Sequence, residues 1–452
     1  MTSPLKHEVE RKTISDTSGP SSNEVMPTAA AGAGKFSKLV RGLGPGLITG
    51  SSDDDPSGIA AYSQVGAQYG YAMLWTMVVS YPLMTAIQET CARIGRVTGE
   101  GIAANLRRHY PRWLLYCVTS LVLAANVFNL GADIGAMAAA AQLLFLAPFW
   151  AYLVLFGATS LALQIFVPYV RYSRYLKWLT LSLFAYIATA FFVHIDWPQA
   201  LRSSFLPQIS WDKSYLTGIV AVLGTTISPY LFFWQASQEV EEVKSARGEK
   251  PLKHAPRQAR WQLERIRSDT YIGMAISNLV AFFIILITAA TLHPLGLMEI
   301  SSAAEAAKAL VPLAGRGAEA LFACGIIGTG MLAVPVLAGS AGYAIGESFK
   351  WRASLEQKPT NAIKFYTTIS AVMVAAVAFN FLHIDPMRAL YWAAVLNGVL
   401  AAPLMAVILL LASSRKVMDK FTIPPYLRTI GWAATLVMLG ASFAAIVTWK
   451  SQ

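Results

Sequence analysis

Long apolar segments of close to 20 residues recur along the chain from about residue 42 to residue 449, and clusters of Lys and Arg separate them. An α-helix needs a run of about this length to cross the hydrocarbon core of a bilayer. The pattern therefore predicts an all-α polytopic membrane protein. We expect eleven spans, over residues 43–70, 72–92, 113–141, 149–168, 177–195, 214–238, 270–293, 318–345, 365–383, 389–412 and 428–449.

The first 37 residues differ from the rest of the chain. They are rich in Ser, Thr, Gly and Pro and show no apolar periodicity, so residues 1–37 are expected to form a disordered tail. Residues 38–452 are expected to form the transmembrane domain. Because the tail contains no apolar core of the signal-peptide type, the first span itself is expected to direct insertion.

Composition strengthens the membrane assignment. The chain is 55% hydrophobic and 13% charged, whereas soluble proteins carry about 25% charged residues. Its three cysteines are isolated and form neither a disulfide pattern nor a zinc pattern. No nucleophile–base pair, His-rich metal motif or phosphate-binding loop appears, so an enzyme is not expected.

The formal net charge of +11 reflects topology. With the N-terminus in the cytoplasm, 30 of the 36 Lys and Arg residues fall on the cytoplasmic side of the predicted spans and six fall on the other side. This asymmetry is the positive-inside rule, and it places the C-terminus on the opposite side, with a bacterial inner membrane as the expected location. Anionic lipids on the cytoplasmic side are expected partners; nucleic acid is not.

Two predicted spans are interrupted by residues that break helices. The first contains SSDDDPSGIA, with Asp53, Asp54 and Asp55 ahead of a proline, and the sixth contains GTTISP. A carboxylate at the bilayer centre costs about 2.5–3.5 kcal/mol, and proline removes a backbone donor. Apart from Lys177 and Arg428, which are the first residues of two spans, the spans contain acids but no Lys or Arg, so their interior should attract a cation.

The two breaks occupy corresponding places in an internal repeat. Each lies in the first helix of a five-span block, spans 1–5 and spans 6–10, and an odd number of spans inverts the second block relative to the first. Paired breaks of this kind indicate a substrate site near the membrane midplane. Non-helical backbone at that depth is tolerated only where it is buried or lines a cavity.

Several segments of the chain resemble the NRAMP family of divalent-metal transporters. They are GPGLITGSSDDDPSGIAAYSQVGAQYGYAMLW in the first span, QETCARIGRVTGEGIAANL after the second, NLGADIG in the third and GTTISPY in the sixth. The resemblance extends over about residues 40 to 449. It implies a LeuT-like fold of two inverted five-helix repeats plus an eleventh helix, with spans 1 and 6 unwound at the centre, and transport by alternating access.

The resemblance also assigns the metal site, with departures from the family pattern. The family's metal-binding Asp falls on Asp55, its metal-binding Asn on Gly58, its backbone carbonyl ligand on Thr225 and its thioether ligand on Ser228. Asp54 is a further candidate beside the first break, and Asn397 lies where the family places a polar residue in the tenth span. The predicted metal site is therefore Asp55, Gly58, Thr225, Ser228, Asp54 and Asn397.

Other departures concern gating and the family's proton path. Tyr230 and Gln235 stand where the family has histidines, and Asn129 stands where it has one member of an acidic pair. Asp133 lies one residue beyond the place of the second acid, which rotates it by about 100° around the helix. All six histidines of the chain lie in loops or at span ends. We therefore expect facilitated, electrogenic passage without proton coupling.

The ligand changes favour a hard cation. Ser228 offers a hydroxyl instead of a soft thioether, and Gly58 removes a side-chain oxygen, which should make the site roomier. Mg²⁺ keeps much of its hydration shell and prefers oxygen ligands. The pattern is similar to the NRAMP-related magnesium-transporter branch, so the expected substrate is Mg²⁺ and also Mn²⁺, carried by a monomer without a cofactor.

Alternatives remain open from the sequence. The first is a proton-coupled transporter of Mn²⁺ or another metal ion, including Al³⁺, in the same family. A Na⁺-coupled carrier of organic solutes with the same fold is disfavoured, because acids at the first break would repel a substrate carboxylate. A metal sensor is disfavoured because no large cytoplasmic output domain is evident.

Overall fold

The computed structural model describes residues 49–50, 52–167, 183–246, 248–382 and 384–450, all of which belong to one unit, Leu43–Gln452. Every regular element within these residues is helical, which confirms the all-α prediction. The predicted tail, residues 1–37, lies outside the described residues.

The helices follow one another in two series that correspond to the predicted repeats. The first series is α3 (Pro56–Tyr69), α4 (Trp75–Thr98), α5 (Ile102–His109), α6 (Arg112–Gln142), α7 (Phe149–Phe166), α9 (Phe184–Thr189) and α10 (Trp197–Phe205). The second is α11 (Lys213–Thr226), α12 (Pro229–Ser245), α13 (Ala259–Thr291), α14 (Ala303–Ala307), α15 (Val311–Ala314), α16 (Ala318–Ser348), α17 (Ile363–Phe379) and α18 (Pro386–Ser413). The chain continues through α19 (Arg415–Met418) to α20 (Pro425–Lys450).

Short 3₁₀ turns connect several of these helices. They are η1 (Gly70–Met73), η3 (Pro256–Gln258), η4 (His293–Leu295), η5 (Lys308–Leu310), η6 (Gly315–Gly317), η7 (Pro359–Asn361), η8 (Asn380–Leu382) and η9 (Asp419–Phe421).

The described helices include eight stretches that are long and apolar enough to cross a membrane. A ninth is added if Pro56–Met73 and Trp75–Thr98, which meet at an angle of 109°, are taken as one span. Residues 43–48 and 51 of the expected first span, residue 168 of the fourth and residues 177–182 of the fifth lie outside the described residues. The expected end of the fifth span at residue 195 is wrong, because α9 ends at Thr189 and an irregular segment leads to α10.

The long apolar helices make the chain an integral membrane protein.

Both predicted helix breaks are present. In the first span the helix ends before Asp55, and α3 begins at Pro56. In the sixth span α11 ends at Thr226 and α12 begins at Pro229. Proline is favoured at a first helical position because its missing N–H would have no partner there. The prolines therefore restart these helices after each break.

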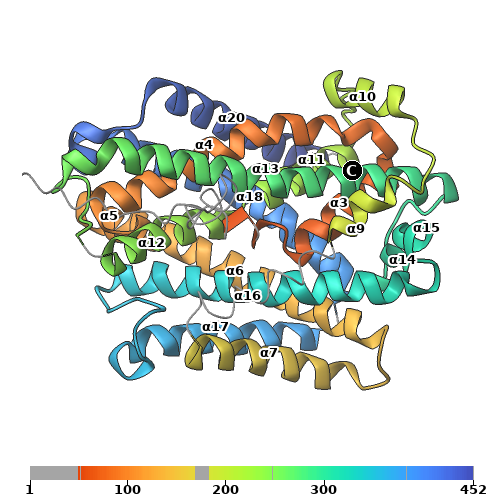
Figure 1. Ribbon diagram of the computed structural model, residues 1–452, viewed down its shortest axis with the longest axis horizontal. Helices are drawn as coiled ribbons and strands as arrows, with labels where there is room; N and C mark the ends of the chain where they lie inside the picture. The colour runs from red at the N-terminus through yellow and green to blue at the C-terminus, as the bar shows by residue number, and fades with distance from the viewer. Residues whose placement is uncertain (1–48, 51, 168–182, 247, 383, 451–452) are drawn as a thin grey trace, which may run out of the picture. The chain divides into compact units, whose positions relative to one another are not determined.

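The helices on either side of the breaks, α3, α11 and α12, are surrounded by other helices. α11 packs against α18 and α3, α3 against α13, and α12 against α4 and α16. Figure 1 shows α5 and α12 toward one end of the helical array and α10, α14 and α15 toward the opposite end. α7 and α17 pack together along one edge, beside α6 and α16 (Figure 1). Both breaks therefore fall in the interior of the bundle.

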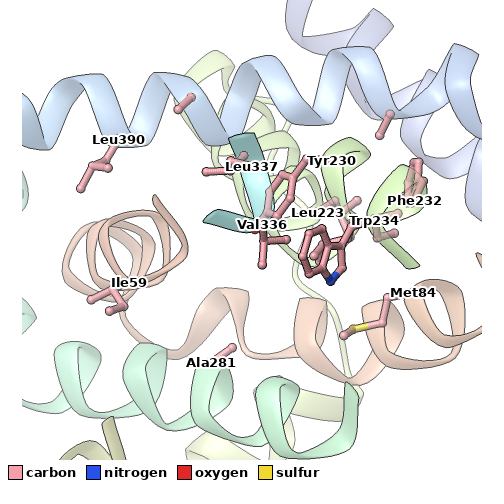
Figure 2. Close-up of a cluster of buried hydrophobic side chains, with 14 of the residues drawn as sticks. Ile59, Met84, Leu223, Tyr230, Phe232, Trp234, Ala281, Val336, Leu337 and Leu390 are labelled. Carbon is pink, nitrogen blue, oxygen red and sulfur yellow. The ribbon is translucent and has the colours of Figure 1, made fainter. Parts of the chain in front are cut away.

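Helix α11 approaches α18 very closely just before its break. A Cβ atom at Gly224 would lie 2.2 Å from the carbonyl oxygen of Ala394, and one at Gly398 would lie 2.4 Å from that of Val220. Only glycine allows two helical backbones to touch in this way. Leu223, next in the chain to Gly224, belongs to the buried core shown in Figure 2. The close crossing fixes the end of α11, and with it the carbonyls at the break.

Candidate metal site

Asp55 lies at the N-terminus of α3 and is completely buried. Its Oδ1 atom accepts two hydrogen bonds of 2.7 Å, from the Gly58 backbone N–H and from the Ser57 hydroxyl. Aspartate is a favoured N-cap because its carboxylate satisfies the free N–H groups of the first turn and meets the positive end of the helix dipole. The cap and the predicted metal ligand are thus the same side chain.

Tyr230 joins the two breaks. Its hydroxyl lies 3.1 Å from Asp55 Oδ2, to which it donates, and 3.2 Å from the carbonyl oxygen of Ser52. The Ser340 hydroxyl of α16 donates to the Tyr230 carbonyl at 2.8 Å and holds the start of α12 in place. Figure 2 shows the Tyr230 ring among core residues that include Leu337. Tyr230, which the sequence analysis considers for gating, therefore lies against Asp55.

Thr225 and Ser228, the two predicted ligands of the second break, contact each other. The Ser228 hydroxyl lies 2.6 Å from the Thr225 carbonyl oxygen and 3.3 Å from that of Gly224. A hydroxyl has one hydrogen to donate but keeps lone pairs that can accept. The carbonyls at the C-terminus of α11 also carry the negative end of its dipole. This break therefore presents oxygen atoms of partial negative charge.

Gly58 faces both breaks. A Cβ atom at this position would lie 3.0 Å from Thr225 Oγ1, 3.3 Å from the Tyr62 ring and 3.5 Å from Asp55 Oδ1. The structure therefore brings Asp55, Gly58 and Thr225 together. The expectation of a roomier site does not hold in this conformation, because the Thr225 and Tyr62 side chains occupy the space that a larger residue at position 58 would fill.

Asp133 of α6 also reaches this region and is completely buried. Neither of its carboxyl oxygens is hydrogen-bonded to another side chain among the described residues. The groups near it are the Asp55 carboxylate and the Ser57 backbone N–H, which is a hydrogen-bond donor to Asp133. The structure thus brings a second carboxyl close to the first.

Asp53 and Asp54 face a different helix from Asp55. Asp53 Oδ2 and Asp54 Oδ1 each lie 2.9 Å from the hydroxyl of Ser277 on α13. Asp54 is therefore held beside α13, whereas Asp55 is held by Tyr230 of α12. Among the described residues, no group of three or more His, Cys, Asp or Glu side chains forms a metal-binding cluster.

Asn129 and Asn397 form a buried pair that connects α6 to α18. Each amide nitrogen donates to the other side chain's oxygen, at 2.8 Å and 3.0 Å, and Asn129 also donates to the Ala125 carbonyl. The two predicted polar residues therefore satisfy each other. Gln235, further along α12, accepts a hydrogen bond from the Thr49 hydroxyl of the first span. Its contact ties the inner part of the sixth span to the start of the described first span.

Sequence reasoning missed four side chains of this region, namely Ser57, Tyr62, Ser277 and Ser340. Ser57 could have been found, because a hydroxyl within the first turn can reach an N-cap carboxylate. Tyr62 lies four residues after Gly58 and shares its helix face, which is a usable signal. Ser277 and Ser340 come from distant helices, and no local pattern connects them to the breaks.

The chain was compared with protein families and curated relatives. The family profile described as natural resistance-associated macrophage protein-like (Nramp) matches residues 46–448. A protein of Mesorhizobium japonicum named divalent metal cation transporter MntH is 26% identical over 442 residues, covering 94% of this chain and 92% of that protein. A protein of the same name from Burkholderia ambifaria is 25% identical, covering 90% of this chain and 88% of that protein.

Solved structures show the same fold. A manganese transporter of Eremococcus coleocola, in complex with an aromatic bis-isothiourea compound, aligns with a TM-score of 0.70 at 17% identity over 94% of this chain and 89% of that chain. Mhp1 in an inward-facing conformation aligns with a TM-score of 0.53 at 12% identity, covering 90% and 91% of the two chains. These likenesses confirm the LeuT-like fold of two inverted five-helix repeats with an eleventh helix.

Proposed function

The chain belongs to the Nramp family, and from this premise we propose that it carries divalent metal cations across the membrane into the cytoplasm. The preferred substrate is Mg²⁺, with Mn²⁺ as a second substrate, and the ions pass partly hydrated and without protons. The relatives named MntH support transport of divalent metals as the general activity. The preference for Mg²⁺ rests on the chemistry of the two breaks.

The observation that carries this proposal is the state of the Asp55 carboxylate. Three protein donors already hold it, Gly58 and Ser57 at one oxygen and Tyr230 at the other. A carboxylate offers about four lone-pair sites, so roughly one remains free. A bare ion that demands several direct carboxylate contacts would have to displace these donors. A hydrated ion can instead donate a water hydrogen to the remaining site.

Other groups near Asp55 can also accept hydrogen bonds from water molecules that are bound to the ion. The buried Asp133 carboxyl has no side-chain donor among the described residues, where the Ser57 backbone N–H is the donor near it. A carboxylate accepts several hydrogen bonds, so Asp133 keeps acceptor capacity, as does the Ser228 oxygen. Water molecules bound to Mg²⁺ are donors, and Mg²⁺ usually retains several of them. An array of acceptors around a single central carboxylate therefore fits a hydrated Mg²⁺ ion.

The absence of sulfur at the second break supports the same preference. Ser228 stands at the break with its hydroxyl turned to the Thr225 carbonyl, and both are hard oxygen ligands. Soft thioether ligands select transition metals over Mg²⁺. None of the predicted ligands contains sulfur, so none of them strongly favours Mn²⁺ over Mg²⁺.

The membrane potential supplies the driving force in this proposal. Two positive charges moving through 100 mV release about 4.6 kcal/mol, which is enough to accumulate Mg²⁺ without a second ion. Tyr230 and Gln235 are engaged in hydrogen bonds with Asp55 and Thr49. Neither side chain exchanges protons readily near neutral pH, which supports passage without protons.

A proton-coupled transporter of Mn²⁺ or another metal ion is the second candidate, and one observation favours it. Asp133 is a buried carboxyl close to Asp55, and neighbouring carboxyls can share a proton. Under this alternative Asp133 would take over the role of the acidic pair that the family has at Asn129 and Ala132.

The deciding experiment uses the full chain reconstituted in liposomes, with Mg²⁺ influx, Mn²⁺ influx and internal pH recorded together. The proposal expects Mg²⁺ influx that increases with a negative-inside potential and leaves the internal pH unchanged. Mn²⁺ influx without Mg²⁺ influx would overturn the preferred substrate. Acidification in step with metal entry, lost in an Asp133→Asn variant, would establish the second candidate instead.

A further inference from the structure

A groove opens on the membrane-facing side of α6, α16 and α17, which pack against one another. Its volume is about 550 Å³, and its walls are formed by Leu123 and Val127 of α6, Ile345 of α16 and the exposed face of α17. On that face Ala371 and Ala375 follow each other at a spacing of four residues and are both exposed. Side chains four residues apart lie on one side of a helix, so two alanines in succession leave a long apolar depression.

One end of the groove is aromatic and basic. The ammonium group of Lys364 lies 5.4 Å from the centroid of the Trp351 ring, and both residues line the groove. Trp351 stacks on Phe349 at 5.3 Å, and Phe349 in turn contacts Tyr116 of α6. Trp and Tyr concentrate where a bilayer meets water because they combine an apolar ring with a polar group. This end of the groove therefore has the character of the membrane surface.

The segment that carries these residues is positively charged on its surface. Residues 346–364 contain four basic residues, Lys350, Arg352, Lys358 and Lys364, and two acids, Glu347 and Glu356. The Glu347 carboxylate is turned inward, where it accepts hydrogen bonds from the Ala104 backbone N–H and the Ser237 hydroxyl. The positive-inside rule assigns the segment to the cytoplasmic side, where the leaflet is rich in anionic lipids.

We propose that this groove binds an anionic phospholipid of the cytoplasmic leaflet. One acyl chain lies along Ala371 and Ala375, and the phosphate lies on Lys364, with Trp351 at the level of the glycerol backbone. The phosphate supplies the negative charge that complements the Lys364 ammonium, whose contact in the structure is an aromatic ring. The lipid site is separate from the metal site, and its existence does not depend on which ion is carried.

Native mass spectrometry of the purified full-length chain tests the headgroup contact. The delipidated protein is titrated with phosphatidylglycerol and, separately, with phosphatidylcholine of the same acyl chains. The wild type should bind phosphatidylglycerol more tightly, and Lys364→Gln should weaken that binding by about fivefold, the effect of one basic residue near a membrane surface. Lys358→Gln is the matched control, because it removes the same charge from the same segment but does not line the groove.

A second pair of variants tests the acyl-chain contact. Ala371→Phe should fill the groove and weaken binding of both lipids, whereas Val374→Phe should not, since Val374 is 65% exposed on the same helix and lies outside the groove. The proposal is overturned if the wild type binds the two lipids equally, if Lys364→Gln and Lys358→Gln behave alike, or if Ala371→Phe binds both lipids as the wild type does.

Discussion

The two helix breaks are alike in their backbone and differ in what their side chains do. At each break a proline restarts the helix, preceded by a polar residue, Asp55 in one case and Ser228 in the other. Asp55 points forward and caps the new helix through the Gly58 N–H. Ser228 makes no cap and points backward, to the carbonyl of Thr225 at the end of the preceding helix.

This difference suits the two breaks to two separate tasks, ion binding at the first and ion selectivity at the second. In the function proposed above, the first break contributes the negative charge that holds a dication in the membrane, and three donors fix the Asp55 carboxylate that carries it. The second break contributes neutral oxygens, whose hardness or softness can change without removing the charge. Tyr230, which belongs to the second break and binds the acid of the first, connects the two. We therefore expect that changes at the first break affect whether ions are bound and that changes at the second affect which ions are chosen.

The largest effect is expected from Asp55→Ala. The variant loses the carboxylate that lies between the two breaks. The other acids of the first break are held at Ser277 on α13, and Asp133 lies on α6. Mg²⁺ influx into liposomes should fall to the level of protein-free liposomes. Asp54→Asn is the matched control at the adjacent position and should retain most of the flux. Equal losses in the two variants would contradict the division between Asp55 and Asp54.

Ser228→Met should change selectivity more than any other single substitution at the second break. A thioether is a soft ligand that favours Mn²⁺ over Mg²⁺. The ratio of Mn²⁺ to Mg²⁺ influx should rise on the order of tenfold, which is the lower end of the effect of changing even an outer-shell residue of a metal site. Ser228→Ala, which removes the hydroxyl without adding sulfur, should lower both fluxes and leave the ratio unchanged. A ratio that rises equally in both variants would show that sulfur is not the cause.

Tyr230→Phe should produce a smaller shift in the same direction. The variant frees Asp55 Oδ2 from its phenol donor, so a less hydrated ion can approach the carboxylate directly. A hydrogen bond to a charged group contributes about 1.5–3 kcal/mol, and we expect the KM for Mn²⁺ to fall by up to about tenfold while the KM for Mg²⁺ changes little.

Tyr343→Phe is the matched control for this variant. Tyr343 is also a buried tyrosine that donates to a carboxylate, at 3.2 Å from Glu241 Oε1, but it lies on α16 away from the breaks. Its loss should reduce stability without changing the ratio of the two KM values. If Tyr230→Phe likewise reduces stability alone, the phenol has no part in selectivity.

The smallest effect on transport is expected from Ser277→Ala. The variant removes the hydroxyl that Asp53 and Asp54 share and should leave the Mg²⁺ KM unchanged, because Asp55 keeps its own donors. The free energy of unfolding should fall by about 1–3 kcal/mol, since buried acceptors lose a partner. Thermal unfolding in detergent and transport in liposomes, measured on one preparation, would check both parts. A raised Mg²⁺ KM would place Asp53 or Asp54 in the ion's path.

Much of the architecture follows from the sequence alone. The length of the apolar segments predicts membrane helices because a bilayer has a fixed thickness. The breaks at Pro56 and Pro229 are local events, since proline both removes a donor and favours the first turn of a helix. That the acids at the first break have a role is predictable because burying a carboxylate is costly and requires compensation, and the choice of Asp55 among the three is what the family resemblance implies. The ion pair between Glu89 and Arg93, four residues apart on α4 and 2.7 Å from each other, is an equally local feature.

The tertiary structure alone decided how the side chains of the site are divided. Three adjacent aspartates look equivalent in sequence, yet the unwound backbone turns Asp55 toward Tyr230 and the other two toward Ser277. The Asn129–Asn397 pair and the filling of the space beside Gly58 by Thr225 and Tyr62 likewise join residues from separate helices. Helix periodicity predicts which face of a helix is buried, but it contains no information about the neighbour that the face meets. That neighbour is fixed by how close the backbones approach, as at Gly224 and Gly398, and only the folded chain defines it.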